Sequence, residues 1–263
     1  MKSDQCKFIF ASDDARRICF RNGLFEGDDL YSLGSPVYHQ HRGRCVHAAT
    51  LEEETGQPLW VFIKKQTGRL RLIPRLTDLK TGQVFHSLPR REWDGIERLS
   101  SVGLHVPERL ALYHEGLFFF RAAIVLREVP PRQSVDAMLR NGTWFRLASS
   151  EQDSILDAMV STMETIHQAG LIWRGVSSKH FFPELQDDAA WKLWLIDCEG
   201  VYARRSTRAR KQSYLKLFRS MKESGADFRT LDRFQRRIAR ARIGTGQFGV
   251  GSKESRPSGL RAA

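Results

Sequence analysis

The chain changes character at Pro130 and Pro131. Before these prolines, short runs of β-branched and aromatic residues are separated by Gly- and Pro-containing turns. This pattern predicts antiparallel hairpins over residues 36–65 and 106–126. After the prolines, apolar residues recur mainly every three or four positions, which is typical of helices. The sequence therefore predicts an α+β fold with two lobes, a β-rich N-terminal lobe and an α-rich C-terminal lobe, and a cleft between them.

The predicted boundaries follow from this change. Residues 31–130 form the expected N-terminal lobe and residues 131–243 the C-terminal lobe, and 41% hydrophobic residues in a chain of 263 can fill a sizeable core. Residues 1–30 alternate short apolar pieces with turns, and we expect a loosely attached lead-in. Residues 244–263 are rich in Gly, Ser and Arg and are expected to form a disordered basic tail.

The clearest predicted helix covers residues 152–169 and ends just before Gly170. Its apolar residues form one stripe at helical spacing, which indicates a face packed against a core. The members of this stripe are Ile155, Met159, Met163 and Ile166.

Several classes of protein do not fit the sequence. The longest apolar stretch, residues 117–126, is about half the length of a membrane span and is interrupted by Arg121. The first residues lack the apolar segment of a secretion signal. The cysteines are far apart, without the paired spacing of a disulfide scaffold or a zinc site, and we expect a cytoplasmic protein. They are Cys6, Cys19, Cys45 and Cys198.

The positive charge is concentrated at one end. Residues 201–263 contain 17 Lys and Arg against 4 Asp and Glu, whereas the other 200 residues contain 25 against 26. Such a block can contact an anionic membrane surface, a phosphorylated substrate or nucleic acid, and it can also be a solvated helical face. We expect the anionic membrane surface or a phosphorylated substrate, and no nucleic acid.

Four elements occur in an order that phosphoryl transfer of the kinase type requires. Lys64 ends a strand of the first hairpin, and Glu92 follows 28 residues later on a helix predicted from about Arg90 to Ser101. Residues 173–180 form a loop after the long helix, and Asp197 ends the next strand. Each signal is weak alone, since a lysine at a strand end is usually only solvated. Their order predicts that the side chains meet in the cleft.

The same segments resemble the lipopolysaccharide core heptose kinases and their wider family of small bacterial sugar and lipid kinases. The resemblance covers roughly residues 31–240. The segments that carry it are residues 34–45, 61–64, 90–99, 103–107, 166–175 and 180–182, and more loosely 211–221. It implies a protein-kinase-like fold, ATP and magnesium as cofactors, and a heptose of the lipopolysaccharide inner core, or its lipid-linked precursor, as acceptor. It also implies action in the cytoplasm at the inner-membrane face.

The resemblance further implies roles for single residues. Lys64 would hold the nucleotide phosphates, Glu92 would position Lys64, and Gly43 would lie in the loop that covers the phosphates. Asp197 and His180 would hold magnesium.

The chain departs from the family at the catalytic loop. The family has His-Arg-Asp, followed after four residues by His or Asn, whereas this chain has Trp173, Arg174 and Gly175, and then His180. Gly175 thus replaces the Asp that accepts the proton of the acceptor hydroxyl. Two hypotheses stay open: a kinase that is slow or uses another carboxylate, and a nucleotide-binding pseudokinase that assists an active core kinase. The carboxylates nearby in sequence are Glu184, Asp187, Asp188 and Glu199.

Overall fold

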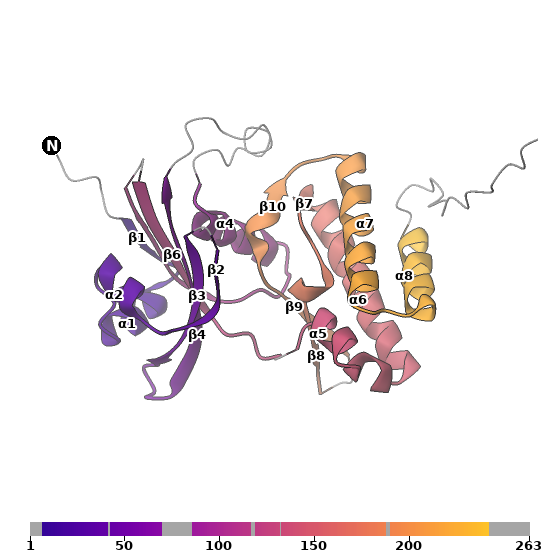
Figure 1. Cartoon of the computed structure of the whole chain (residues 1–263), viewed down its shortest axis with the longest axis horizontal. Coiled ribbons are helices and arrows are strands. Elements are labelled where there is room, and N and C mark those ends of the chain that lie inside the picture. Colours follow the sequence, from indigo (N-terminus) through magenta and orange to yellow (C-terminus); the bar gives the residue numbers. More distant parts are fainter. Residues whose placement is uncertain are drawn as a thin grey trace, which may run out of the picture.

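A computed structural model describes residues 7–41, 43–69, 86–116, 119–131, 133–187 and 190–241. A six-stranded sheet occupies one end of the molecule, and helices with two small two-stranded sheets occupy the other (Figure 1). This is the predicted α+β architecture with a β-rich and an α-rich part. The expected basic tail, residues 244–263, lies outside the described residues.

The large sheet has the strand order β1-β5-β6-β4-β3-β2, and all neighbouring strands are antiparallel. The two predicted hairpins are both present, and the pairing of β4 with β6 joins them. The strands are β1 (Lys7–Phe10), β2 (Ser35–His41), β3 (Arg44–Glu52), β4 (Pro58–Arg69), β5 (Arg109–Glu115) and β6 (Phe119–Arg127).

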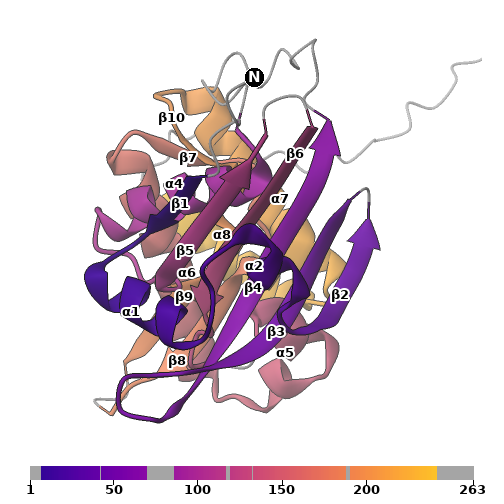
Figure 2. The ribbon, with the colours of Figure 1, turned by 90° about the vertical axis from the view of Figure 1, so that its left-hand side faces the viewer.

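Both faces of this sheet are covered, as the alternation along β6 shows. Ala123 and Val125 belong to the apolar cluster formed with α1 (Asp13–Arg21) and α2 (Gly27–Ser32). Ile124 points the other way, into the cluster that contains α4 (Leu88–Ser100). Successive side chains of a strand face opposite sides, so each face packs its own helices. Figure 2 shows α1 and α2 in front of the strands.

Residues 7–30 are part of this folded lobe, so the expectation of a loosely attached lead-in is wrong. β1 pairs with β5 over four residues, with Lys7 opposite His114. Helix α1 packs against the sheet, and only 7% of the surface of its residue Ile18 is exposed. The buried side chain of Lys65 donates hydrogen bonds to the carbonyl oxygens of Tyr31 and Leu33, which fix the end of α2.

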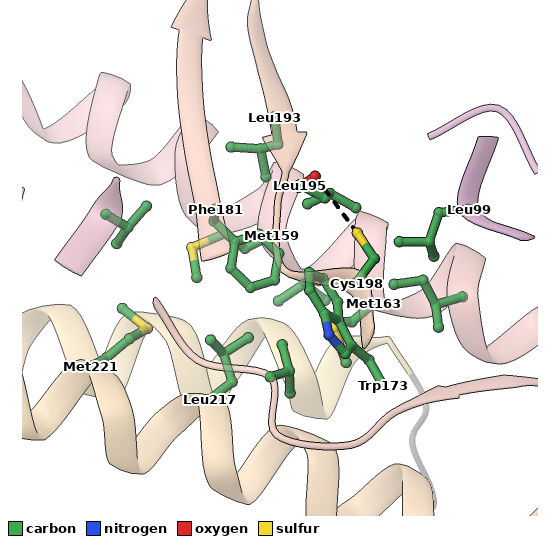
Figure 3. Packing of buried hydrophobic residues seen from close by; sticks show 14 of the residues in the cluster. Leu99, Met159, Met163, Trp173, Phe181, Leu193, Leu195, Cys198, Leu217 and Met221 are labelled. Carbon is green, nitrogen blue, oxygen red and sulfur yellow. Dashed lines mark hydrogen bonds between the residues drawn. The ribbon is translucent and has the colours of Figure 1, made fainter. Parts of the chain in front are cut away.

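The C-terminal part packs around the long helix predicted from the apolar stripe. The four stripe residues are fully buried. Figure 3 shows Met159 and Met163 beside Trp173, Phe181 and Leu217. The elements are α5 (Val135–Arg140), α6 (Ser149–Gln168), β7 (Leu171–Trp173), β8 (Phe181–Leu185), β9 (Trp191–Leu195), β10 (Val201–Ala203), α7 (Thr207–Glu223) and α8 (Phe228–Arg240), with short 3-10 helices η1 (Thr143–Arg146), η2 (Ser178–His180) and η3 (Cys198–Gly200).

Helix α4 connects the two parts. Its residues Trp93, Ile96 and Leu99 share one apolar cluster with the sheet and with α6. The segment after α4 runs along β9, where the Leu195 amide donates to the His105 carbonyl oxygen over 2.9 Å. The sheet and the helical part are therefore held against each other by a common core, and the residues at their junction have defined positions.

Candidate active site

Lys64 lies between two carboxylates from different parts of the molecule. Its ammonium nitrogen is 2.6 Å from Glu92 Oε1 and 3.4 Å from Asp197 Oδ1. Asp197 Oδ2 is in turn 3.3 Å from His180 Nε2. The structure thus brings together the four side chains that the sequence order predicted to meet.

The secondary structure explains how these groups come to face each other. Lys64 sits inside the sheet, opposite Val46 of β3 and Ile124 of β6, so neighbouring strands fix its backbone on both sides. Glu92 lies on the buried face of α4, with 2% of its surface exposed. The helix begins after Ser87, whose hydroxyl accepts the Arg90 amide and caps the first turn. The cap and the buried face set the rotation of α4 that directs Glu92 to the sheet.

Asp197 has an unusual backbone. With φ of 60° and ψ of 51°, it is the non-glycine residue with positive φ among the described residues. A left-handed conformation costs a non-glycine residue roughly 1–2 kcal/mol, and it persists where the surroundings hold it. Here the turn from β9 into η3 directs the carboxylate toward Lys64 and His180. The strain is concentrated at the residue whose side chain joins the two parts of the site.

The charges of these groups depend on one another. Burial alone would lower the pKa of Lys64, but Glu92 and Asp197 outweigh it and raise that pKa above its ordinary value. Burial would likewise raise the pKa of Asp197, but Lys64 and His180 hold it well below the usual range. Lys64 is therefore a stable cation and Asp197 a stable anion at neutral pH. Burial raises the pKa of Glu92 even though Lys64 opposes the rise.

One hydrogen bond of the His180 ring defines its tautomer. The Ser177 amide donates to His180 Nδ1 over 3.1 Å, so the proton of the neutral ring is on Nε2, the nitrogen that faces Asp197. The ring also stacks on Trp173, with centroids 5.5 Å apart and planes at 20°. Backbone and indole thus hold the imidazole in place, and its N–H side is presented to the carboxylate.

The remaining predicted positions lie around this centre. Gly175 has φ of 91°, and the space where a Cβ would stand is open. Arg174 is exposed, and its amide donates to the Gly200 carbonyl oxygen over 2.9 Å. Gly43 turns the chain from β2 to β3 with φ of 78°, and its carbonyl oxygen accepts the Thr67 amide of β4. This turn therefore lies three residues along β4 from Lys64.

The four carboxylates considered as substitutes for the missing Asp lie in different places. Glu199 interacts electrostatically with Asp197, Arg44 and Lys64, and burial raises its pKa. Glu184 accepts a hydrogen bond from Trp194 Nε1 over 2.8 Å and lies 3.8 Å from Lys192, outside this group. Asp187 is exposed after β8, and Asp188 lies outside the described residues. Glu199 is thus the one of the described three that the fold brings to the centre.

Two glycines that the sequence analysis did not single out make the site possible. A Cβ on Gly95 of α4 would overlap the carbonyl oxygen of Cys198, and one on Gly200 would overlap the carbonyl oxygen of Arg174. Helix α4, η3 and the loop after β7 therefore approach one another backbone to backbone. A glycine inside a helix is a known signal of close packing, but the sequence alone does not say what it packs against.

Comparison with known proteins shows the family of the chain. The model of the lipopolysaccharide kinase (Kdo/WaaP) family matches residues 76–237, more than half of the chain. The chain belongs to this family. Membership supports a phosphotransferase acting on the lipopolysaccharide core, and it gives no support to the pseudokinase alternative.

A solved structure also shows the fold. WaaP in complex with acyl carrier protein is similar to this chain with a TM-score of 0.64 and 19% sequence identity, over 90% of each chain. This likeness extends from the sheet to the C-terminal helices, so the two-lobed kinase-like fold covers nearly the whole molecule. No curated protein sequence matches the chain. Among the described helices of this family member, none is long and apolar enough to cross a membrane.

The contact between α4 and η3 gives a first prediction. Gly95→Ala should lower the free energy of unfolding by about 1–3 kcal/mol, because the new methyl group must displace a backbone carbonyl in a packed core. It should also move Glu92 away from Lys64 and reduce phosphate transfer. Chemical denaturation and a transfer assay measure the two effects. Ser100→Ala, at an exposed position of the same helix, should change neither the free energy of unfolding nor the transfer rate. If the two variants were equally stable, the close contact of Gly95 with Cys198 would be contradicted.

Proposed function

We propose that the protein transfers the γ-phosphate of ATP to a hydroxyl group of a sugar, a heptose, in the inner core of lipopolysaccharide. The observation that carries this proposal is the position of Lys64 between Glu92 and Asp197. Glu92 is buried and holds the ammonium group from the α4 side. Asp197 is more exposed, with 36% of its side chain accessible, so a second cation can reach its carboxylate. Phosphoryl transfer needs this combination of a fixed cation and a second, accessible anion.

The donor atoms at Asp197 fit magnesium. Mg²⁺ prefers carboxylate oxygens and is usually bound by one or two of them together with substrate phosphates and water. Asp197 stays ionised at neutral pH, so its carboxylate can hold the ion. Within the described ranges, no group of three or more His, Cys, Asp and Glu is suited to a metal. Bound there, magnesium would neutralise phosphate charge.

In this proposal the nucleotide phosphates replace one of the present partners of Lys64. The ammonium group would keep Glu92 and turn from Asp197 to the phosphates, since Asp197 is the more distant of the two carboxylates. The turn at Gly43 would cover the phosphates from the sheet side. Arg174 would contact the acceptor beside Gly175.

The hydrogen bond to His180 Nδ1 favours a positioning role over the ligand role expected from the resemblance. A magnesium ligand must offer a lone pair, whereas Nδ1 is already used by the Ser177 amide and Nε2 carries the proton toward Asp197. We therefore propose that His180 orients the Asp197 carboxylate.

The conformation of Gly175 bears on the missing base. A residue with a Cβ is strained at φ of 91°, so the loop follows a path suited to glycine. Glu199 is the nearby carboxylate that lies at the centre. We propose that Glu199 accepts the proton of the acceptor hydroxyl. As the proton leaves, the hydroxyl oxygen bonds to the γ-phosphorus, and the bond between the γ-phosphorus and the departing ADP breaks.

The central test is phosphate transfer from ATP, with magnesium, to dephosphorylated core lipopolysaccharide. Lys64→Met and Asp197→Asn should each reduce the rate by about 10²-fold or more, because both act on the charge of the transferred group. Lys222→Met, an exposed lysine on α7, is the charge-matched control and should behave as the wild type. Transfer that survives both active-site substitutions would refute the proposed function.

The proton acceptor is tested by comparing three variants in the same assay. Glu199→Gln should lower the rate about 10²-fold, the usual size of general-base help, whereas Glu184→Gln should leave it unchanged. Gly175→Asp should give no large gain, since the loop must strain to carry a side chain. A gain of 10²-fold in Gly175→Asp would show instead that the loop is a degraded copy of the family loop.

The pH profile tests the role of Glu92. Burial raises the pKa of Glu92 to about 7, and the charged groups facing it are Lys64 from β4 and Asp197 and Glu199 from the segment after β9. Because only the ionised carboxylate holds Lys64, kcat/KM for ATP should fall as the pH drops through about 7. The Glu92→Gln variant should show a low kcat/KM that does not fall further as the pH drops through about 7, whereas Glu184→Gln should keep this fall. If kcat/KM of Glu92→Gln fell as it does in the wild type, the fall would belong to another titrating group.

A further inference from the structure

A pocket of 320 Å³ lies in the C-terminal part, on the side of β7 and β10 that faces the beginning of α7. Figure 1 shows these two strands beside the upper end of α7. Four cations line it: Arg174 from the loop after β7, Arg204 after β10, and Arg208 and Lys216 from α7. Its size is at the lower end of the range for small-molecule sites. The sequence shows an excess of Lys and Arg after residue 200, but it does not predict this pocket.

These four cations have no carboxylate partner within the described part of the chain. Two arginines of α8, in contrast, are paired: Arg233 contacts Asp153 at 2.9 Å, and Arg237 contacts Asp157 at 2.6 Å. Like charges gathered around one cavity repel each other, and no acidic side chain offsets this repulsion here. A bound anion would offset it, so the pocket is built for a negative ligand.

The backbone adds to the positive potential. Helix α7 has 17 residues and begins at the pocket, where Ser206 caps it by accepting the Ala209 amide. The first turn of a helix has amides without intrahelical acceptors, and its dipole favours an anion. Gln212, one turn further along, adds a neutral amide that can donate. One guanidinium group can donate two parallel hydrogen bonds to two oxygens of a phosphate, and amides can donate to the remaining oxygens. This set of donors therefore suits a phosphate group.

The pocket adjoins the candidate active site. Trp173 lines the pocket and also stacks on His180, which faces Asp197. Arg174 precedes Gly175, and its amide is fixed to Gly200, next to Glu199. A ligand held in the pocket therefore has its other end near the loop where the acceptor hydroxyl would lie.

We propose that this pocket binds a phosphate group that the acceptor already carries before transfer, so that the substrate is a phosphorylated saccharide or glycolipid. For the identity of the acceptor, this inference rests on the proposed function. The anion site itself rests on the four unpaired cations and the start of α7. The phosphate in the pocket would set which hydroxyl of the sugar reaches the active site.

The inference is tested by Arg204→Ala/Arg208→Ala, with Arg229→Ala/Arg240→Ala as the control. The control removes two exposed arginines of α8 that also lack an ion-pair partner in the part of the chain described. With core oligosaccharide that retains its other phosphates, the pocket variant should raise the acceptor KM at least tenfold, while kcat and the KM for ATP change less than twofold. With phosphatase-treated oligosaccharide, the wild type should already show the high KM, and the pocket variant should raise it no further. Equal wild-type KM values for the two acceptors, or an equal effect of the control variant, would overturn the inference while leaving the proposed function intact.

A second measurement does not depend on transfer. Calorimetry should detect binding of glucose 6-phosphate to the wild type and to Asp197→Asn, and at least tenfold weaker binding to the pocket variant; glucose should not bind detectably. Vesicles of phosphatidylglycerol and phosphatidylethanolamine distinguish the sugar phosphate from a membrane. If the pocket variant lost vesicle binding but kept glucose 6-phosphate binding, the pocket would be a lipid-surface contact and the proposal would be wrong. If the sugar phosphate bound as proposed and no acceptor were phosphorylated, the proposed function would fail and the anion site would stand.

Discussion

The ion pair between Lys64 and Glu92 is the constraint on which the position of α4 against the sheet, and with it the site, depends. A carboxylate with 2% of its surface exposed cannot remain charged without a partner, and removing one member of a buried pair typically costs about 3–5 kcal/mol. Lys64 is fixed in the centre of the sheet, so α4 must keep one rotation and one distance from it. Because Gly95 of α4 also packs against Cys198 of η3, Asp197 lies beside Lys64 as well.

Backbone contacts make this constraint effective. Gly95 and Gly200 allow α4, η3 and the loop before Gly175 to meet without intervening side chains, and Trp173 fills the space below them. Figure 3 shows Trp173, Cys198 and Leu195 at the centre of the apolar cluster that supports this junction. The strained backbone of Asp197 is held by these contacts. The site is therefore built on rigid elements, as precise positioning of phosphate groups requires.

The candidate active site and the adjoining pocket differ in charge, and each would therefore accept a different kind of ligand. At the centre, Lys64 faces Glu92, Asp197 and Glu199, an excess of acidic side chains that would suit the magnesium ion of the proposed function. In the pocket beyond Trp173, the four cations lack carboxylates, an excess of positive charge that calls for an anion. A nucleotide with its magnesium and a phosphorylated acceptor would balance both.

The sequence by itself determined the features that depend on local pattern. Alternation predicted the hairpins, and the stripe from Ile155 to Ile166 predicted α6. The order of Lys64, Glu92 and Asp197 predicted their meeting, because each is fixed by its own strand or helix. Only the tertiary structure decided the pairing of β1 with β5, the contact between Gly95 and η3, and the grouping of Arg174 with the arginines near the start of α7. These depend on segments far apart in the chain, and local pattern carries no information on which distant segment a strand edge, a glycine or an exposed cation will face.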